Sequence, residues 1–116
     1  MLRKRKNKVP PPEEGTCPLT TCMRLVGGTW TPNIIWYLRD EARRFSELKS
    51  DIEGVSAKVL TERLRRLEKD GLIVRQVVPT SPPSVEYSLT DLGHELRPAI
   101  EAIAKVGAKI KKRGLK

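Results

Sequence analysis

The residues with the most evident chemistry lie on one predicted helix within the segment 55–75. Leu60, Leu64 and Leu67 recur at i, i+4 and i+7, so they share one face of that helix. The opposite face carries hydrogen-bond donors and acceptors: Lys58, Glu62, Arg65 and Lys69, with Thr61 and Arg66 on its borders. A helix that is anchored by one leucine stripe and exposes basic and polar groups suits insertion into a DNA groove. The alternative is an ordinary solvated amphipathic helix.

The segments before this helix indicate how it is positioned. The Ser56 hydroxyl can cap its first turn, and Gly71 supplies the left-handed residue that ends it. A short helix is predicted over residues 45–52, joined to the Ser56 helix by a turn that contains Gly54. Two short helices joined in this way, the second polar on its outer face, form a helix-turn-helix. Two further helices are predicted earlier in the chain, from Pro18 to the Gly27-Gly28 pair and from Thr31 to about Asp40, with Trp30 and Trp36 in the core.

The segments after Gly71 predict a wing and a long last helix. Residues 72–78 and 85–89 are expected to form a β-hairpin with a proline-rich loop at its tip, and a hairpin directly after a helix-turn-helix is a wing. Thr90 and Asp91 begin the last helix, which Pro98 is expected to distort. Its apolar stripe suggests a dimer interface, with packing on the first helix as the alternative; the interface residues are Leu92, Leu96, Ile100, Ile103 and Val106.

The net charge of +9 is concentrated at the two ends of the chain. Residues 1–12 and 102–116 hold 11 of the 23 lysines and arginines and none of the 14 acids, which leaves 12 cations against 14 acids between them. We interpret residues 1–15 as a flexible arm that either contacts DNA or only solubilises, residues 16–107 as one domain and residues 108–116 as a basic tail. Any DNA-binding face of the domain therefore depends on how its charges are arranged, and the ends add sequence-independent attraction to phosphates.

The composition argues against several other classes of protein. The apolar runs are too short for a secretory signal or a membrane span, so no membrane partner is expected. Two cysteines are too few for a disulfide scaffold, and a cytoplasmic location is the default expectation. Aromatic residues make up only 4% of the chain, which argues against a platform for stacking single-stranded bases.

The remaining chemical candidates are two cysteines and one histidine. Cys17 precedes Pro18 at the predicted start of the first helix, where the helix dipole lowers the pKa of a thiol; a buried, inert cysteine is the alternative. Cys22 is expected in the core. These cysteines and the single His94 do not make a zinc site, and neither a metal nor another cofactor is expected. The sequence has no glycine-rich phosphate-binding loop, and no nucleophile and base lie at a spacing that would let them act together. The chain is therefore not expected to be an enzyme.

Three motifs that fall in register carry a family resemblance: RFSEL at residues 44–48, the helix from Leu60-Thr61 to Gly71-Leu72, and PPSVEYSLT at residues 82–90. A further match is the segment CPLTTCMRLVGGTW at residues 17–30. With these motifs, residues 16–107 strongly resemble the HxlR-type winged helix-turn-helix transcriptional regulators, which are relatives of the MarR group. The resemblance implies a mainly helical α+β fold with N- and C-terminal dimerisation helices. It also implies a homodimer that binds palindromic or near-palindromic double-stranded DNA.

The resemblance assigns roles to residues of this chain. It makes the Ser56 helix the recognition helix, whose residues nearest the bases are expected to be Ser56, Lys58, Val59, Thr61, Glu62, Arg65 and Arg66. Basic side chains can donate to guanine, Glu62 can accept from cytosine, and the methyl groups suit thymine; Arg65 or Arg66 can instead hold phosphate. Contacts to the backbone are expected from Arg43, Arg44, Lys49, Thr80 and Ser81, although Arg44 is also a candidate for an intramolecular ion pair. Some relatives use a cysteine before a proline to sense oxidants or electrophiles, which makes Cys17 a candidate sensor.

Together these observations predict a sequence-specific transcriptional regulator, and they identify no small-molecule effector. Two other classes stay open: a non-sequence-specific architectural DNA-binding protein, and a winged helix used only for protein–protein contact. The basic ends would serve the first of these, and the slightly acidic domain is compatible with the second.

Overall fold

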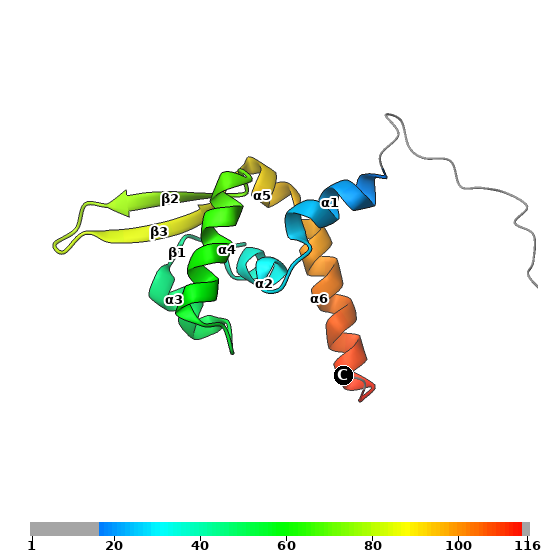
Figure 1. The fold of residues 1–116 in the computed structure, drawn as a ribbon. Coiled ribbons are helices and arrows are strands. Elements are labelled where there is room, and N and C mark those ends of the chain that lie inside the picture. The colour runs from blue at the N-terminus through cyan, green and yellow to red at the C-terminus, as the bar shows by residue number, and fades with distance from the viewer. Residues whose placement is uncertain (1–16, 115–116) are drawn as a thin grey trace, which may run out of the picture.

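The computed structural model describes residues 17–114, and within that range the chain forms six helices and three short strands (Figure 1). In chain order these are α1 (Pro18–Val26), α2 (Thr31–Tyr37), β1 (Arg43–Arg44), α3 (Phe45–Asp51), α4 (Ala57–Lys69), β2 (Ile73–Val78), β3 (Ser84–Leu89), α5 (Asp91–Glu95) and α6 (Arg97–Lys112). The mainly helical α+β fold agrees with the sequence prediction. The arm expected at residues 1–15 lies outside the described residues, and α6 continues well past residue 107, where the basic tail was expected to begin.

Helix α4 has the boundaries and the buried face that its sequence predicts. The Ser56 Oγ accepts a hydrogen bond from the Val59 N–H at 3.1 Å, which caps the first turn. At the other end Gly71 has a φ of +80°, and the Leu72 N–H donates to the Leu67 carbonyl at 2.9 Å. This is the hydrogen bond of a Schellman motif, which needs a left-handed residue at Gly71. The three stripe leucines are almost fully buried, with at most 1% of each exposed.

Helix α3 precedes α4 and completes the helix-turn-helix. The Glu47 Oε1 accepts from the Arg44 backbone N–H at 2.9 Å and so fixes the start of α3. Leu48 and Ile52 are buried against the core, and Gly54, with a φ of +88°, lets the chain turn sharply toward α4. The predicted helix-turn-helix is therefore present, although α3 ends at Asp51, one residue earlier than predicted.

Helix α2 ends at Tyr37 rather than near Asp40. The Arg39 guanidinium donates to the Trp36 carbonyl at 2.7 Å and stacks on the Trp36 ring, 3.7 Å from its centre. The Arg39 side chain thus provides a hydrogen-bond donor for a carbonyl group in the last turn of α2. Trp30 and Trp36 are half-buried and pack against the core rather than inside it.

The three strands form one antiparallel sheet in the order β1-β3-β2. The hairpin of β2 and β3 is the predicted wing, with register pairs from Ile73 with Leu89 to Val78 with Ser84, and it projects away from the helices (Figure 1). Strand β1 was not predicted. It pairs Arg43 with Tyr87, so the segment that enters α3 is attached to the wing.

The last predicted helix is divided into α5 and α6 at Leu96, and Pro98 lies in the first turn of α6, where a proline is tolerated. Thr90 fixes the start of α5: its Oγ1 accepts from the Gly93 N–H at 3.2 Å and donates to the Gly71 carbonyl at 2.6 Å. A Cβ on Gly93 would collide with the Leu72 carbonyl oxygen. The end of α4 and the start of α5 are thus joined by a contact that only glycine allows.

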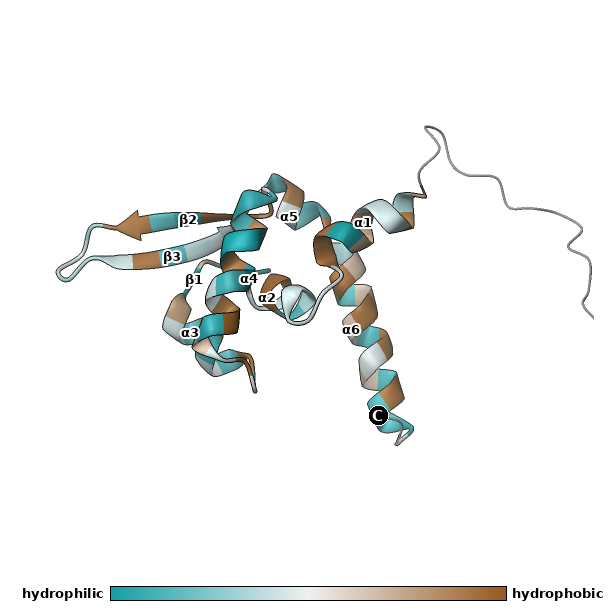
Figure 2. Ribbon diagram, in the orientation of Figure 1, coloured by the Kyte–Doolittle hydropathy of each residue, from teal (hydrophilic) through white to brown (hydrophobic). Residues whose placement is uncertain are grey.

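One hydrophobic core joins all the larger helices, and apolar side chains remain outside it on α1 and α6. Figure 2 shows apolar segments along both helices. The exposed large hydrophobic residues of these two helices are Leu19, Met23, Ile103, Val106 and Ile110. Cys22, expected in the core, is exposed, because α1 buries only its C-terminal end. Within residues 17–114, no helix combines the length and the apolar character that crossing a bilayer requires.

Candidate nucleic-acid interface

The polar face of α4 is accessible over its whole length. Lys58, Glu62 and Arg65 are exposed, and Val59 and Thr61 are half-buried at its edges. The Thr61 hydroxyl donates to the Ala57 carbonyl at 2.8 Å, so its oxygen is left as an acceptor. Ser56, also exposed, uses its oxygen as the cap of α4 and keeps its proton as a donor. The face therefore presents donors, acceptors and methyl groups from a single helix that is fixed at both ends.

Arg65 and Arg66 differ in their surroundings. The Arg66 Nε lies 3.2 Å from the Asp70 Oδ2, and this i, i+4 ion pair holds Arg66 beside the end of α4. None of the ion pairs found among residues 17–114 includes Arg65. Of the two arginines, Arg65 is therefore the one that can reach a base without breaking an existing contact.

The cations expected to hold phosphate lie at the start and end of α3. The Arg43 Nη1 lies 3.3 Å from the Glu41 carboxylate, and its Nε is buried without a hydrogen-bond partner among the described residues. The intramolecular ion pair that was considered for Arg44 is thus formed by Arg43 instead. Arg44 and Lys49 are exposed. These two side chains are the ones available to a DNA backbone.

The wing supplies a further set of polar groups. Thr80 and Ser81 are exposed at its tip, where the Thr80 hydroxyl donates to the Pro82 carbonyl at 2.7 Å. Arg75, on β2, is an exposed cation that was not among the residues expected to contact DNA. The signal that could have found it is a single cation in an otherwise apolar or neutral strand.

Cys17 is exposed at the start of α1. The backbone N–H groups of Thr20 and Leu19, in the first turn of α1, lower the pKa of the Cys17 thiol because they stabilise the thiolate. The alternative of a buried Cys17 is therefore wrong. Within residues 17–114, no three histidine, cysteine or acidic residues are grouped closely enough to hold a metal ion.

The comparison with known proteins agrees with this geometry. Residues 25–114 match the sequence pattern of the HxlR-like helix-turn-helix family. The chain belongs to that family. It is 39% identical over 97 residues to the HTH-type transcriptional regulator YdeP of Bacillus subtilis strain 168, a match that covers 84% of this chain and 76% of YdeP. This HxlR-like chain is therefore a transcriptional regulator with a helix-turn-helix fold.

Solved structures of similar proteins have the same fold. A transcriptional regulator of the MarR family from Porphyromonas gingivalis W83 superposes with a TM-score of 0.77 at 41% identity, covering 88% of this chain and 97% of that protein. The redox regulator HypR in its oxidised form superposes with a TM-score of 0.76 at 33% identity, covering 80% of this chain and 96% of HypR. The winged helix-turn-helix architecture of this HxlR-like chain is thereby established.

The residues expected at a dimer interface of this HxlR-like chain fall into two groups. Leu96 and Ile100 are 8% and 5% exposed, so they already belong to the core of their own chain. Leu92, Ile103 and Val106 are 39%, 62% and 54% exposed. Only these three retain enough accessible surface to form a substantial contact with a second chain.

The position of Cys17 leads to a prediction about its reactivity. A lowered pKa means that the thiolate forms at a lower pH, so alkylation of Cys17 by iodoacetamide should reach its half-maximal rate at a lower pH than alkylation of the free thiol of an unstructured, end-capped cysteine peptide. The measurement uses a Cys22→Ser variant, in which Cys17 is the only thiol, and mass spectrometry across pH 6–10. A half-maximal rate at or above the pH found for the free thiol would contradict the prediction.

Proposed function

We propose that this chain is a homodimeric, sequence-specific DNA-binding regulator that places α4 in the major groove and the wing on the flanking backbone. The observation that carries the proposal is the division of α4 into two faces. Its leucines are buried, while Lys58, Glu62 and Arg65 are exposed on the opposite side. Each of these polar side chains has a hydrogen-bonding partner on a base edge in the major groove. The phosphate contacts come from Arg44, Lys49 and the wing.

A homodimer accounts for the exposed apolar face of α6. Ile103, Val106, Gly107 and Ile110 follow at i, i+3, i+4 and i+7 and line an apolar groove, together with Ala102. Leu19 and Met23 on α1 add further exposed apolar surface. An exposed apolar groove of this kind is typical of a protein–protein contact. A two-fold dimer would present two copies of α4 to two half-sites one helical turn of DNA apart.

Cys17 gives this regulator a response to oxidants or electrophiles. Its thiol is exposed and its pKa is lowered, which are the two properties of a reactive cysteine. The likeness to the redox regulator HypR supports this part of the proposal.

Arg65→Ala tests sequence-specific recognition. A preferred site is first selected from random double-stranded DNA, and the affinity of each variant is then measured for that site and for random DNA at equal salt. Arg65→Ala should weaken binding to the selected site by about 1–3 kcal/mol more than binding to random DNA, because a base contact is lost. The control Arg75→Ala removes the same charge from the wing and should weaken both kinds of binding alike.

One outcome would change the role of Arg65, and two others would replace the proposal. Equal losses with Arg65→Ala on both DNAs would reduce Arg65 to a phosphate contact. Failure to select any sequence would favour an architectural DNA-binding protein. Failure to bind either DNA would favour a role in protein–protein contact.

Ile103→Glu tests the dimer. A charge placed in the apolar groove of α6 should convert the dimer into a monomer, because it cannot be buried without a partner. Light scattering coupled to size-exclusion chromatography measures the mass, and circular dichroism checks the fold. The control Val77→Glu makes the same kind of change at a similarly exposed residue of the wing, so it should leave the dimer intact. A wild-type monomer, or a dimer that survives Ile103→Glu, would contradict the proposed interface.

Cys17→Ser tests the response to oxidants. After treatment with hydrogen peroxide or a quinone, wild-type protein and the Cys22→Ser variant should change their affinity for the selected site, whereas Cys17→Ser should not. Fluorescence-anisotropy titrations of the selected DNA site before and after the treatment measure this change in affinity. An undiminished response in Cys17→Ser would remove the sensor role.

A further inference from the structure

A cavity of about 230 Å³ lies between the end of α1, the turn from α1 to α2, and the C-terminal half of α4. We propose that this cavity is a binding site for an oxyanion, that is, for a phosphate or carboxylate group. It is lined by Arg24, Leu25, Gly27, Gly28, Thr31, Arg63, Arg66, Leu67 and Asp70. A cavity of this volume has room for such a group together with several water molecules.

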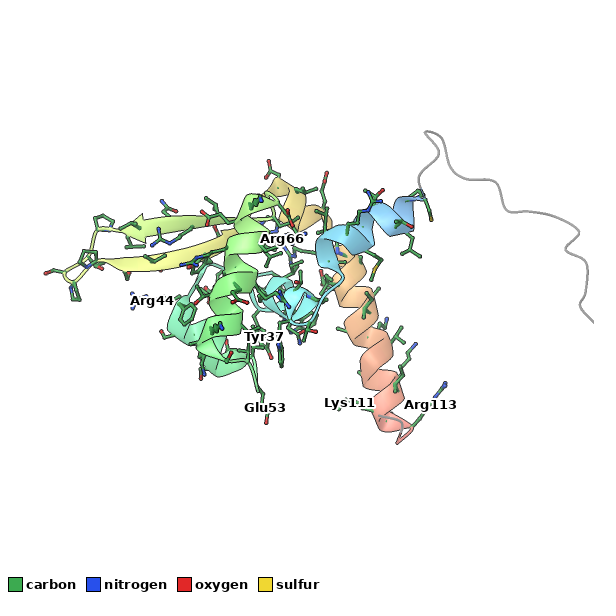
Figure 3. The ribbon with its side chains drawn as sticks, viewed as in Figure 1. Tyr37, Arg44, Glu53, Arg66, Lys111 and Arg113 are labelled. Carbon is green, nitrogen blue, oxygen red and sulfur yellow. The ribbon has the colours of Figure 1, made fainter. Side chains whose placement is uncertain are left out.

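Two of the three arginines are held in place by a hydrogen bond from one nitrogen each. The Arg63 Nε donates to the Thr29 carbonyl at 3.0 Å, and the Arg66 Nε donates to the Asp70 carboxylate at 3.2 Å. Among the described residues, these contacts leave the terminal nitrogens of both guanidinium groups without a hydrogen-bond acceptor. Figure 3 labels Arg66 on the side of α4 next to α1. Each side chain therefore has one fixed contact and keeps further donors that no described residue uses.

The charge around the cavity is not balanced. Three arginines line the cavity with one acidic residue, Asp70, which already pairs with Arg66. Arg24 has no ion-pair partner among residues 17–114. Like charges held close together repel each other, and a bound anion offsets that repulsion.

The chemistry of the lining selects an oxyanion over an apolar ligand. A guanidinium group donates through two parallel N–H bonds to carboxylate or phosphate oxygens, which gives it both affinity and geometric selectivity. Gly27 and Gly28 form part of the wall without side chains. A Cβ on Gly27 would collide with the Met23 carbonyl oxygen, and Gly28 has a φ of +150°. Glycine is therefore the residue that these two positions of the wall accommodate without strain.

Occupancy of this site would link two parts of the molecule. Arg24 belongs to α1, while Arg63 and Arg66 belong to α4, beside the face that carries Lys58, Glu62 and Arg65. An anion bound by all three arginines would tie α1 to α4. The oxyanion has two sources, a free small anion or a phosphate of bound DNA, and both use the same donors.

The first experiment tests the free anion and needs no DNA, so it is independent of the proposed function. Isothermal titration calorimetry measures the binding of inorganic phosphate and of citrate to the full chain in a chloride buffer. We expect wild-type protein to bind at least one of them, and Arg24→Gln to bind it about tenfold more weakly or worse, because a charged hydrogen bond is lost. Lys105→Gln removes the same charge from an exposed position on α6 outside the cavity, so it should bind like wild type.

The second experiment tests a DNA phosphate with the same variants. Arg24→Gln should then weaken binding to random double-stranded DNA more than Lys105→Gln does, and should reduce the slope of log affinity against log salt by about one. Either positive result supports the site and identifies the source of the oxyanion. If phosphate and citrate fail to bind and Arg24→Gln matches Lys105→Gln on DNA, the site is overturned. The arginines then only offset the partial negative charge at the C-terminal ends of α1 and α4.

Discussion

Burial of the leucine stripe of α4 is the constraint on which the rest of the molecule depends. Leu60, Leu64 and Leu67 are at most 1% exposed, and each contributes about 1.5–3 kcal/mol by leaving water. Successive residues of a helix are 100° apart, so this burial fixes the rotation of α4 about its axis. Rotating the helix by even one residue would bring charged side chains toward the core, at a cost that the small domain cannot offset. The outward direction of the polar face is therefore a consequence of core packing.

The same rotation gives α4 a third side, which faces α1. Arg63 and Arg66 lie on this side, together with Asp70, and they meet Arg24 from α1 across the cavity. Helix α1 also carries Cys17 at its opposite end and exposed apolar residues along its length. Thiol chemistry, a partner chain and an anion would all act on this one helix. The turn that follows it is joined to α4 by the hydrogen bond from the Arg63 Nε to the Thr29 carbonyl.

The sequence by itself determined the features that depend on near neighbours. Caps, glycine stops and leucine spacing each involve residues within about five positions, so α4, with Ser56 before it and Gly71 after it, could be predicted almost to the residue. The wing followed from strand patterns on either side of a proline-rich loop. The exposed donors and acceptors of the candidate DNA-binding face followed as well, because a helix with one buried stripe exposes its other side. Family-specific motifs in register extended these predictions to the whole domain.

Only the tertiary structure decided what depends on residues far apart in the chain. Strand β1 has no pattern of its own and exists because Arg43 meets Tyr87, more than forty positions later. The apolar stripe of the last helix has one spacing throughout, yet Ile100 is packed against its own chain and Ile103 is exposed, because α6 extends beyond the core after that point. The cavity between Arg24, Arg63 and Arg66 likewise arises from packing between helices. Periodicity reports which side of a helix is apolar, but what covers that side is set by the positions of other elements.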